Sequence, residues 1–321
     1  MKLKEGQLTV QVENLVDFAS LTRHECDLSS FLRYQDLSGY FTMLDGPTYE
    51  NLVRYFWVRV EIYDKNVARL EEHEKVLIDP SVEGKTREEL GLKPFTETEI
   101  RSNIMGIPVT ITEDVIARSC RITVERSIEE NLSIVTSHCK GIVKDYLFKG
   151  NAKGKYKDMQ KEHKVLQKLM QECFLPKAGG VDQLSSEHKV FLHFFVTFEK
   201  VNLPKYIFHH MLCVLKEIQE KNRTFILYGR LLLEIFHQGG ILEPLKLSKV
   251  VNDDQLGTVV GKYINGTTLK HIHLVKEVVK METDMKESNI LSNLMDDFPP
   301  ISKQYPIDVQ AAFVYDHWKT T

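Results

Sequence analysis

Cysteine is scarce in this sequence of 321 residues, and the motifs that mark most catalytic and metal sites are missing. The five cysteines stand at positions 26, 120, 139, 173 and 213 without a C-x-x-C pair, so neither a zinc knuckle nor a disulfide framework is predicted. A phosphate loop of the form G-x-x-x-x-G-K-[ST] is also missing. These absences predict reduced thiols, no cofactor, no metal and a protein that is not an enzyme.

Neither sign of charge predominates, and no long apolar run is present. The 42 lysines and arginines face 45 acidic residues, so no overall field favours nucleic acid or an anionic membrane. No segment approaches the roughly 18 apolar residues of a membrane helix, which predicts no membrane partner. Met1 to Lys4 has no signal-peptide pattern, so we expect a cytoplasmic or nuclear protein that is not secreted.

The strongest pattern lies in residues 40–120 and begins with an aromatic-rich segment. Asp45-Gly46-Pro47 is a turn followed by apolar residues at steps of three and four, which predict a core helix over residues 47–70. The residues on its buried face would be Leu52, Val53, Phe56, Val60, Tyr63, Val67 and Leu70. With this much apolar surface to cover, the helix is predicted to lie at the centre of the core.

A charged insert and a hairpin follow this helix. Residues 71–99 are rich in charge and turn formers, which predicts an exposed insert with one short helix at Thr86–Leu90. Residues 103–111 alternate around Gly106, which favours a β-hairpin, although Gly106 and Pro108 are also compatible with an irregular loop. Thr112 is the predicted N-cap of the next helix.

Three stretches of the chain resemble the plant transposon protein domain, a family found in long terminal repeat retroelements of flowering plants, including Athila-type and legume elements. They are GYFTMLDGPTYENLVRYFWVRVEIYD (39–64), LKPFTETEIRSNIMGIPVTITEDVIARSC (92–120) and FILYGRLLLEIFHQGGI (225–241). The matching features are the run Val53 to Trp57, the extended segment around Gly106, and the helix start at Tyr228-Gly229. The resemblance covers most of residues 40–245, and because the family has no established activity, it implies no catalytic residue.

The second half of the sequence is predicted to be almost entirely helical. Residues 149–157 (KGNAKGKYK) mark a change in composition, so we predict an N-terminal lobe over 1–150, with helices up to residue 149, and a C-terminal helical lobe over 155–321. Pro176 to Gly180, Gly239-Gly240 and Pro299-Pro300 would separate its helices. The predicted fold class is therefore mainly α, with one small β-hairpin in the N-terminal half.

The histidines and cysteines give no strong candidate for a metal or catalytic site. His271 and His273 would share one face of a strand, but no further ligand has the spacing of a known zinc site. Cys139, Cys173 and Cys213 lie on apolar stripes, which indicates buried structural cysteines.

One basic segment is the candidate for nucleic-acid binding. Lysines interleaved with a tyrosine can follow a phosphate backbone, although a solvated linker and helix face explain the same pattern. The residues are Lys149, Lys153, Lys155, Tyr156, Lys157, Lys161 and Lys164.

Two functions are therefore predicted from the sequence. The leading hypothesis is a non-enzymatic structural or interaction protein that associates with itself. The alternative is a nucleic-acid-binding accessory protein, similar to a retroelement gag protein, that binds RNA or DNA through residues 149–164.

Overall fold

The computed structural model describes residues 5–123, 159–175, 186–220, 224–247 and 256–278, together with Pro306 and Val309. Helices predominate among these residues and β structure is confined to short strands, so the helix-rich class is confirmed. Several strand pairs were not predicted. They make the fold a mixture of helices with small sheets rather than purely α.

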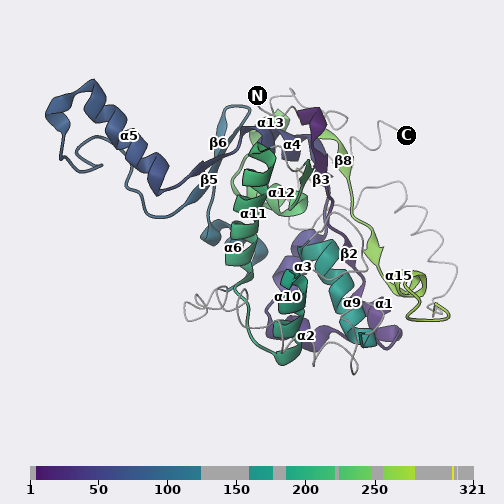
Figure 1. Ribbon diagram of the computed structural model, residues 1–321. Coiled ribbons are helices and arrows are strands. Elements are labelled where there is room, and N and C mark those ends of the chain that lie inside the picture. The colour runs from purple at the N-terminus through teal and green to yellow at the C-terminus, as the bar shows by residue number, and fades with distance from the viewer. Residues whose placement is uncertain are drawn as a thin grey trace.

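The first part of the chain forms short elements followed by two longer helices (Figure 1). In order they are η1 (Glu5–Gln7), β1 (Thr9–Val10), β2 (Leu15–Val16), α1 (Phe18–Arg23), α2 (Ser29–Tyr34), α3 (Ser38–Leu44), β3 (Thr48–Tyr49), α4 (Glu50–Arg59), β4 (Glu61–Tyr63), α5 (Lys65–Ile78), η2 (Pro80–Val82), β5 (Glu99–Ile104), β6 (Ile107–Ile111) and α6 (Glu113–Cys120).

The later elements are mostly helical, as predicted, with short strands between them. They are α9 (Lys161–Leu169), the π-helical η5 (Met170–Phe174), α10 (Ser186–Thr197), α11 (Leu203–Gln219), β7 (Phe225–Ile226), α12 (Gly229–Gln238), α13 (Leu242–Leu247), β8 (Thr258–Val259), β9 (Tyr263–Ile264) and α15 (Gly266–His271). The predicted helices over residues 124–149 lie outside the described residues.

Strands from the start of the chain pair with strands from its end. β1 pairs with β7 and β2 with β9, both in parallel, and β3 pairs with β8 in antiparallel orientation. The predicted lobe boundary near residue 150 lies outside the described residues and stays a prediction. The described elements before and after it pack on one another.

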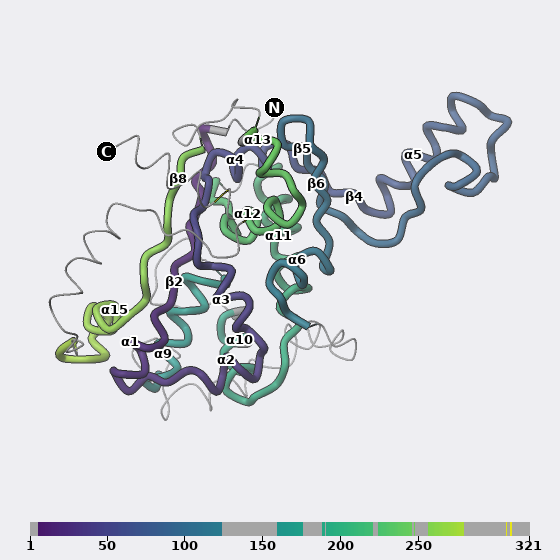
Figure 2. Tube along the Cα trace, turned by 180° about the vertical axis from the view of Figure 1, so that it is seen from behind, coloured from purple at the N-terminus to yellow at the C-terminus, as the bar shows by residue number. Residues whose placement is uncertain are grey.

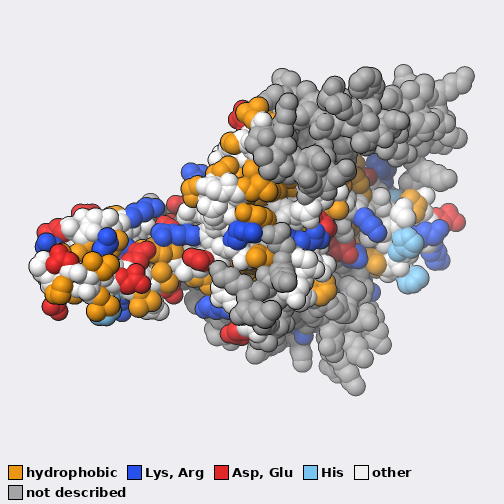
Figure 3. All heavy atoms as spheres, turned by 90° about the horizontal axis from the view of Figure 1, so that it is seen from above, with side chains coloured by type: hydrophobic (Ala, Val, Ile, Leu, Met, Phe, Trp, Pro, Cys, Tyr) orange, Lys and Arg blue, Asp and Glu red, His pale blue; other side chains and the backbone are white. Residues whose placement is uncertain are grey.

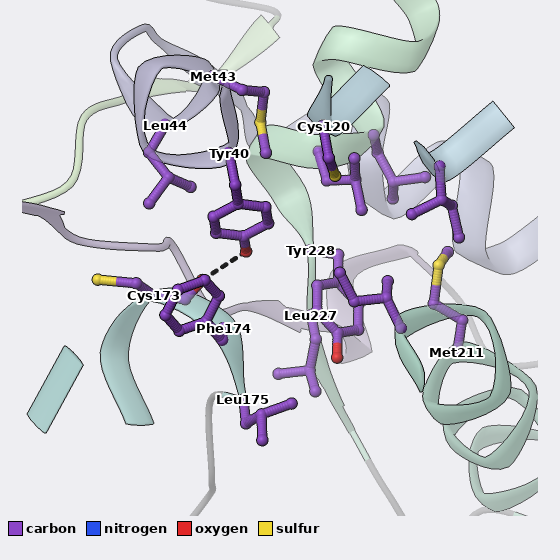
Figure 4. Packing of buried hydrophobic residues seen from close by; sticks show 14 of the residues in the cluster. Tyr40, Met43, Leu44, Cys120, Cys173, Phe174, Leu175, Met211, Leu227 and Tyr228 are labelled. Atoms are coloured by element: carbon purple, nitrogen blue, oxygen red, sulfur yellow. Dashed lines mark hydrogen bonds between the residues drawn. The ribbon is translucent and has the colours of Figure 1, made fainter. Parts of the chain in front are cut away.

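Helix α12 lies at the centre of the core, where it packs against α3, α4 and α6. Burial of each large apolar side chain there contributes about 1.5–3 kcal/mol. Figure 4 shows part of this core: the hydroxyl group of Tyr40 donates a hydrogen bond of 2.6 Å to the carbonyl oxygen of Cys173. Because the phenol is fully buried, this bond satisfies a polar atom that water cannot reach.

The predicted single helix over residues 47–70 is wrong. Helix α4 ends at Arg59, β4 follows, and α5 begins at Lys65 after Asp64, whose carboxylate accepts hydrogen bonds from two backbone N–H groups of the first turn. The chain breaks here because Glu61–Tyr63 pairs with Glu99–Arg101 of β5. As a result Val67 and Leu70, which the prediction placed in the core, are exposed.

The predicted hairpin is confirmed around Gly106, whose φ of 92° suits the turn between β5 and β6. Strand β5 begins at Glu99, four residues earlier than predicted, and β4 extends the hairpin to three strands. The N-cap is confirmed too, because the hydroxyl oxygen of Thr112 accepts a hydrogen bond from the backbone N–H of Val115.

Candidate functional site

Residues 64–98 project from the three-stranded sheet as an arm (Figures 1 and 2). The arm leaves the sheet after Tyr63 of β4 and returns at Glu99 of β5, which pair with each other. Helix α5 forms its outgoing half. The predicted exposed insert therefore begins inside a helix, and the segment Thr86–Leu90 forms turns rather than a helix.

The guanidinium group of Arg87 joins the returning half of the arm to α5. Its Nη2 atom donates to the carboxylate of Glu71 at 2.8 Å and to the hydroxyl group of Tyr63 at 2.7 Å. Its Nη1 atom donates to Glu72 at 2.9 Å, and its Nε atom donates to the carbonyl oxygen of Lys93 at 3.0 Å. A planar guanidinium with this many partners fixes the two halves in one geometry.

The base of the arm is held by contacts around Tyr63. The guanidinium carbon of Arg101 lies 3.3 Å from the centroid of the Tyr63 ring, and the ring of Phe95 lies 6.0 Å away. Hydrogen bonds from Arg87 lower the pKa of Glu71, whereas burial and the bond to Glu71 raise the pKa of Tyr63. Both shifts favour the pairing seen here, an ionised Glu71 and a protonated tyrosine.

Helix α5 also carries exposed apolar side chains, which we call the α5 stripe. It consists of Val67, Leu70, Leu77 and Ile78, and the last three are 60%, 69% and 82% exposed. At 100° per residue, the four positions fall within an arc of about 100° on one side of the helix. Figure 3 shows hydrophobic side chains on the arm among charged ones. Several large apolar side chains exposed on one side of a helix are typical of a protein contact.

A second cluster of charged residues lies inside the body. The Nη2 atom of Arg230 donates to the carboxylate of Glu234 at 3.1 Å, and both side chains are 2% exposed. Glu13 accepts a hydrogen bond from the backbone N–H of Arg230 and thereby caps the N-terminus of α12. Burial raises the pKa of Glu13 to about 7 despite the charge of Arg230. These groups are enclosed by the core, so we assign them to stability.

The predicted nucleic-acid segment is described only in part. Lys161 lies on α9, half-buried, and its Nζ atom donates to the carbonyl oxygen of His24 at 3.0 Å. Lys164 is half-buried on the same helix. The other members of the set lie outside the described residues, namely Lys149, Lys153, Lys155, Tyr156 and Lys157. Nucleic-acid binding by this segment stays a prediction.

The predicted strand with His271 and His273 on one face is wrong, because His271 ends helix α15 and His273 lies in the turn that follows it. Among the described residues, no three potential ligands come together as a metal site. Cys173 is buried as predicted, and burial raises its pKa and that of Cys120, which disfavours a reactive thiolate. The prediction for Cys213 is wrong, because this residue is exposed on α11. Among the described helices, none is long and apolar enough to cross a membrane.

Sequence reasoning missed the α5 stripe. It assigned Val67 and Leu70 to the core and Leu77 and Ile78 to a charged insert. Asp64 was a usable signal for a helix start, because aspartate is a favoured N-cap residue. Its carboxylate accepts hydrogen bonds from the backbone N–H groups of Asn66 and Val67 in the first turn of α5. A helix start at Lys65 separates the stripe from the core helix.

Comparison with protein-family models, with curated proteins and with solved structures finds no match to this chain.

Proposed function

We propose that this protein is a non-enzymatic structural protein that associates with further copies of itself, and that the α5 stripe forms the contact. The observation that carries the proposal is the arm. Helix α5 is bonded to the arm's own returning segment through Arg87, and it leaves Leu70, Leu77 and Ile78 exposed to solvent.

The energetics of the arm favour a contact surface. Burying apolar area stabilises a complex by about 25 cal/mol per Å², and large exposed side chains supply most of that area. The Arg87 contacts fix the arm before it binds, which reduces the entropy lost on association. A floppy charged insert would lack this advantage.

The sequence resemblance to the plant transposon protein domain extends the proposal. A retroelement-encoded protein without enzymatic activity fits a structural role in assembly, and self-association is the property that such a role requires. Leu70, Leu77 and Ile78 of the α5 stripe lie between the first two resembling stretches, 39–64 and 92–120.

Size-exclusion chromatography with light scattering over a wide concentration range tests the proposal. We expect the wild-type mass to rise with concentration, and we expect Leu70→Glu/Leu77→Glu to remain monomeric throughout. Leu247→Glu is the matched control, because Leu247 is 76% exposed on α13, on the body of the molecule. A wild-type protein that is monomeric at every concentration would contradict the proposal.

The same experiment addresses the alternative function. Added RNA at low salt would shift the elution of a nucleic-acid-binding protein, and the shift would disappear as salt rises. Reversal of the charges at Lys149, Lys153, Lys155 and Lys157 would abolish such a shift without affecting the mass of the protein alone.

A further inference from the structure

A pocket lies between α1, α2 and α3, at the end of the molecule away from the arm (Figures 1 and 2). Its volume of about 380 Å³ falls within the range of small-molecule sites in proteins. The buried side chains of Leu28 and Leu32 line it. So do the half-buried rings of Phe18 and Phe41, whose centroids lie 4.9 Å apart, edge to face. The pocket therefore presents an apolar, partly aromatic surface to a ligand.

The size of the pocket fits one small molecule better than a protein. Its lining comes entirely from residues 18–41, and the three helices around it are only six, six and seven residues long. A stable protein interface takes about 20–30 residues on each side. We therefore treat the ligand as a single organic molecule with an apolar body.

Three exposed charged side chains also line the pocket, namely Asp27, Arg33 and Asp36, which together carry one net negative charge. Hydrogen bonds from the hydroxyl and backbone N–H groups of Ser29 lower the pKa of Asp27, and the charge of Arg33 contributes to the same shift. Arg33 therefore offsets the charge of Asp27 in part. The carboxylate of Asp36 forms no hydrogen bond or ion pair with any residue that the structure describes. Its negative charge is left for a ligand.

Helices α1 and α2 end alike, and the comparison shows what Asp36 lacks. Each helix is followed by an acidic residue with a left-handed backbone, Glu25 with a φ of 57° and Asp36 with a φ of 55°. Glycine is the usual residue at such a position, and a negative charge at the C-terminus of a helix is unfavourable. For Glu25 the chain supplies a cation, since the Nζ atom of Lys161 lies 4.0 Å from its carboxylate. Among the described residues Asp36 has no such partner, and it lines the pocket instead.

We propose that this pocket binds a small organic cation, a molecule with an aromatic or branched apolar body and a single ammonium group. The ammonium group would pair with Asp36, and the apolar body would contact Phe18 and Phe41. An ammonium group near the face of an aromatic ring gains further attraction from the ring. The inference goes beyond the proposed function and does not depend on it, because the pocket and the α5 stripe lie at different ends of the molecule.

Ligands that lack either part fit the pocket less well. An anion would be repelled by the carboxylate of Asp36, and a neutral molecule would displace water from that carboxylate without replacing it. A bare ammonium ion would leave the apolar lining unused, although burial of apolar area contributes about 25 cal/mol per Å². Selectivity is therefore expected for molecules that combine a positive charge with an apolar body.

Three probes with the same phenylethyl body and different charge test the inference. They are phenethylamine, which is a cation at neutral pH, the uncharged phenethyl alcohol, and the anion hydrocinnamate. Each is titrated into the 321-residue chain, and shifts of the backbone amide signals of residues 18–41 locate the site and give the dissociation constant. We expect phenethylamine to bind with a dissociation constant of about 1 mM, roughly tenfold more tightly than the alcohol, and hydrocinnamate to leave these signals unchanged.

Substitutions separate the charge of Asp36 from its backbone conformation. Asparagine is accepted at left-handed positions, so Asp36→Asn should keep the stability of the fold, weaken phenethylamine binding about tenfold and leave binding of the alcohol unaffected. Glu25→Gln is the matched control, because it removes the same charge from the same backbone conformation outside the pocket, and it should bind both probes like wild type. Ser38→Trp, at an exposed position of the lining, should fill the pocket and abolish binding of both probes.

Contrary results would show which part of the inference is wrong. If no probe shifts the amide signals of residues 18–41, or if Ser38→Trp binds like wild type, the pocket is not a ligand site. Equal affinities for the amine and the alcohol, or equal losses in Asp36→Asn and Glu25→Gln, would mean that Asp36 does not select a cation. Thermal unfolding close to wild type shows that each variant folds. The self-association proposed above is tested by mass, so either proposal can fail without the other.

Discussion

The body and the arm each contain an arginine bonded to glutamate, but the two clusters differ in exposure. Arg230 and Glu234 are one turn apart in α12 and almost completely buried. Arg87 is 13% exposed and contacts two partially exposed glutamates far from it in sequence, Glu71 and Glu72. Removing a buried partner leaves an uncompensated charge in the core, whereas water can solvate the partners on the arm. The arginine–glutamate pair in the body therefore stabilises the whole fold, whereas the arginine–glutamate pairs on the arm order only that local segment.

The largest effect is expected for Arg230→Met. The substitution leaves Glu234 buried without its cation, with Glu13 at the N-terminus of the same helix, so we expect a loss of about 3–5 kcal/mol in the free energy of unfolding. Chemical denaturation measures this loss. Arg54→Met is the matched control, because Arg54 forms an i,i+4 pair with Glu50 in which the side chains are 23% and 22% exposed, and its loss should be about 1 kcal/mol.

A double variant sharpens this result. Arg230→Met/Glu234→Leu removes both charges, so it should recover most of the stability lost in Arg230→Met. If the double variant is no more stable than the single one, the loss arises from the shape of the arginine rather than from an unpaired carboxylate.

The next largest effect is a pH dependence of the free energy of unfolding that arises from Glu13. The native pKa of this carboxyl is raised to about 7 from 4.5, so between these values the native state binds more protons than the unfolded state. The free energy of unfolding should therefore decrease as pH rises from about 4.5 to about 7, by up to about 3 kcal/mol. Urea denaturation at pH 5 and pH 8 measures it.

Comparison with Glu13→Gln isolates the contribution of this group from the other titrating residues. We expect the stability of wild type to fall relative to the glutamine variant between pH 5 and pH 8. Parallel pH dependences of the two proteins would mean that Glu13 titrates normally in the folded state. No comparable dependence is expected from Glu71 on the arm over this interval, because hydrogen bonds from Arg87 lower its pKa.

Local patterns predicted the elements that local chemistry determines. Gly106 and the alternation around it identified the hairpin, and Thr112 identified the start of α6, because a positive φ and a side-chain cap depend on neighbouring residues. The break after Arg59 could not be found this way. Val60 and Tyr63 fit a helical period, whereas Val60-Glu61-Ile62 alternates as in a strand, and pairing with β5, some forty residues later, decides between the two.

Long-range pairing also explains why the buried cluster was missed. β1 and β7 pair over only two residues and are more than two hundred positions apart in the chain, so neither carries a recognisable strand pattern. Glu13 follows β1, and its role as the cap of α12 exists only once that pairing forms. The residues of the α5 stripe could be recognised as apolar in the sequence. That they face solvent follows only from the end of α4 at Arg59, which places them on a separate helix outside the core.

The smallest effect on global stability, and the most local one, is expected for Arg87→Met. This change removes the hydrogen bonds to Glu71 and Glu72, which are partly exposed, and to the buried Tyr63, whose hydroxyl group keeps its bond to Glu71. The free energy of global unfolding should therefore fall by about 1 kcal/mol or less. The arm should open far more readily, since these bonds join its two halves. Hydrogen exchange of backbone amides in residues 65–78 should accelerate about tenfold, while amides of α12 keep their wild-type rates. Arg69→Met, at an exposed position of α5, is the control.

Because a loosened arm loses more entropy on binding, Arg87→Met should also weaken self-association although every residue of the α5 stripe is intact. Unchanged association with accelerated exchange would show that the stripe binds without the arm being fixed in advance.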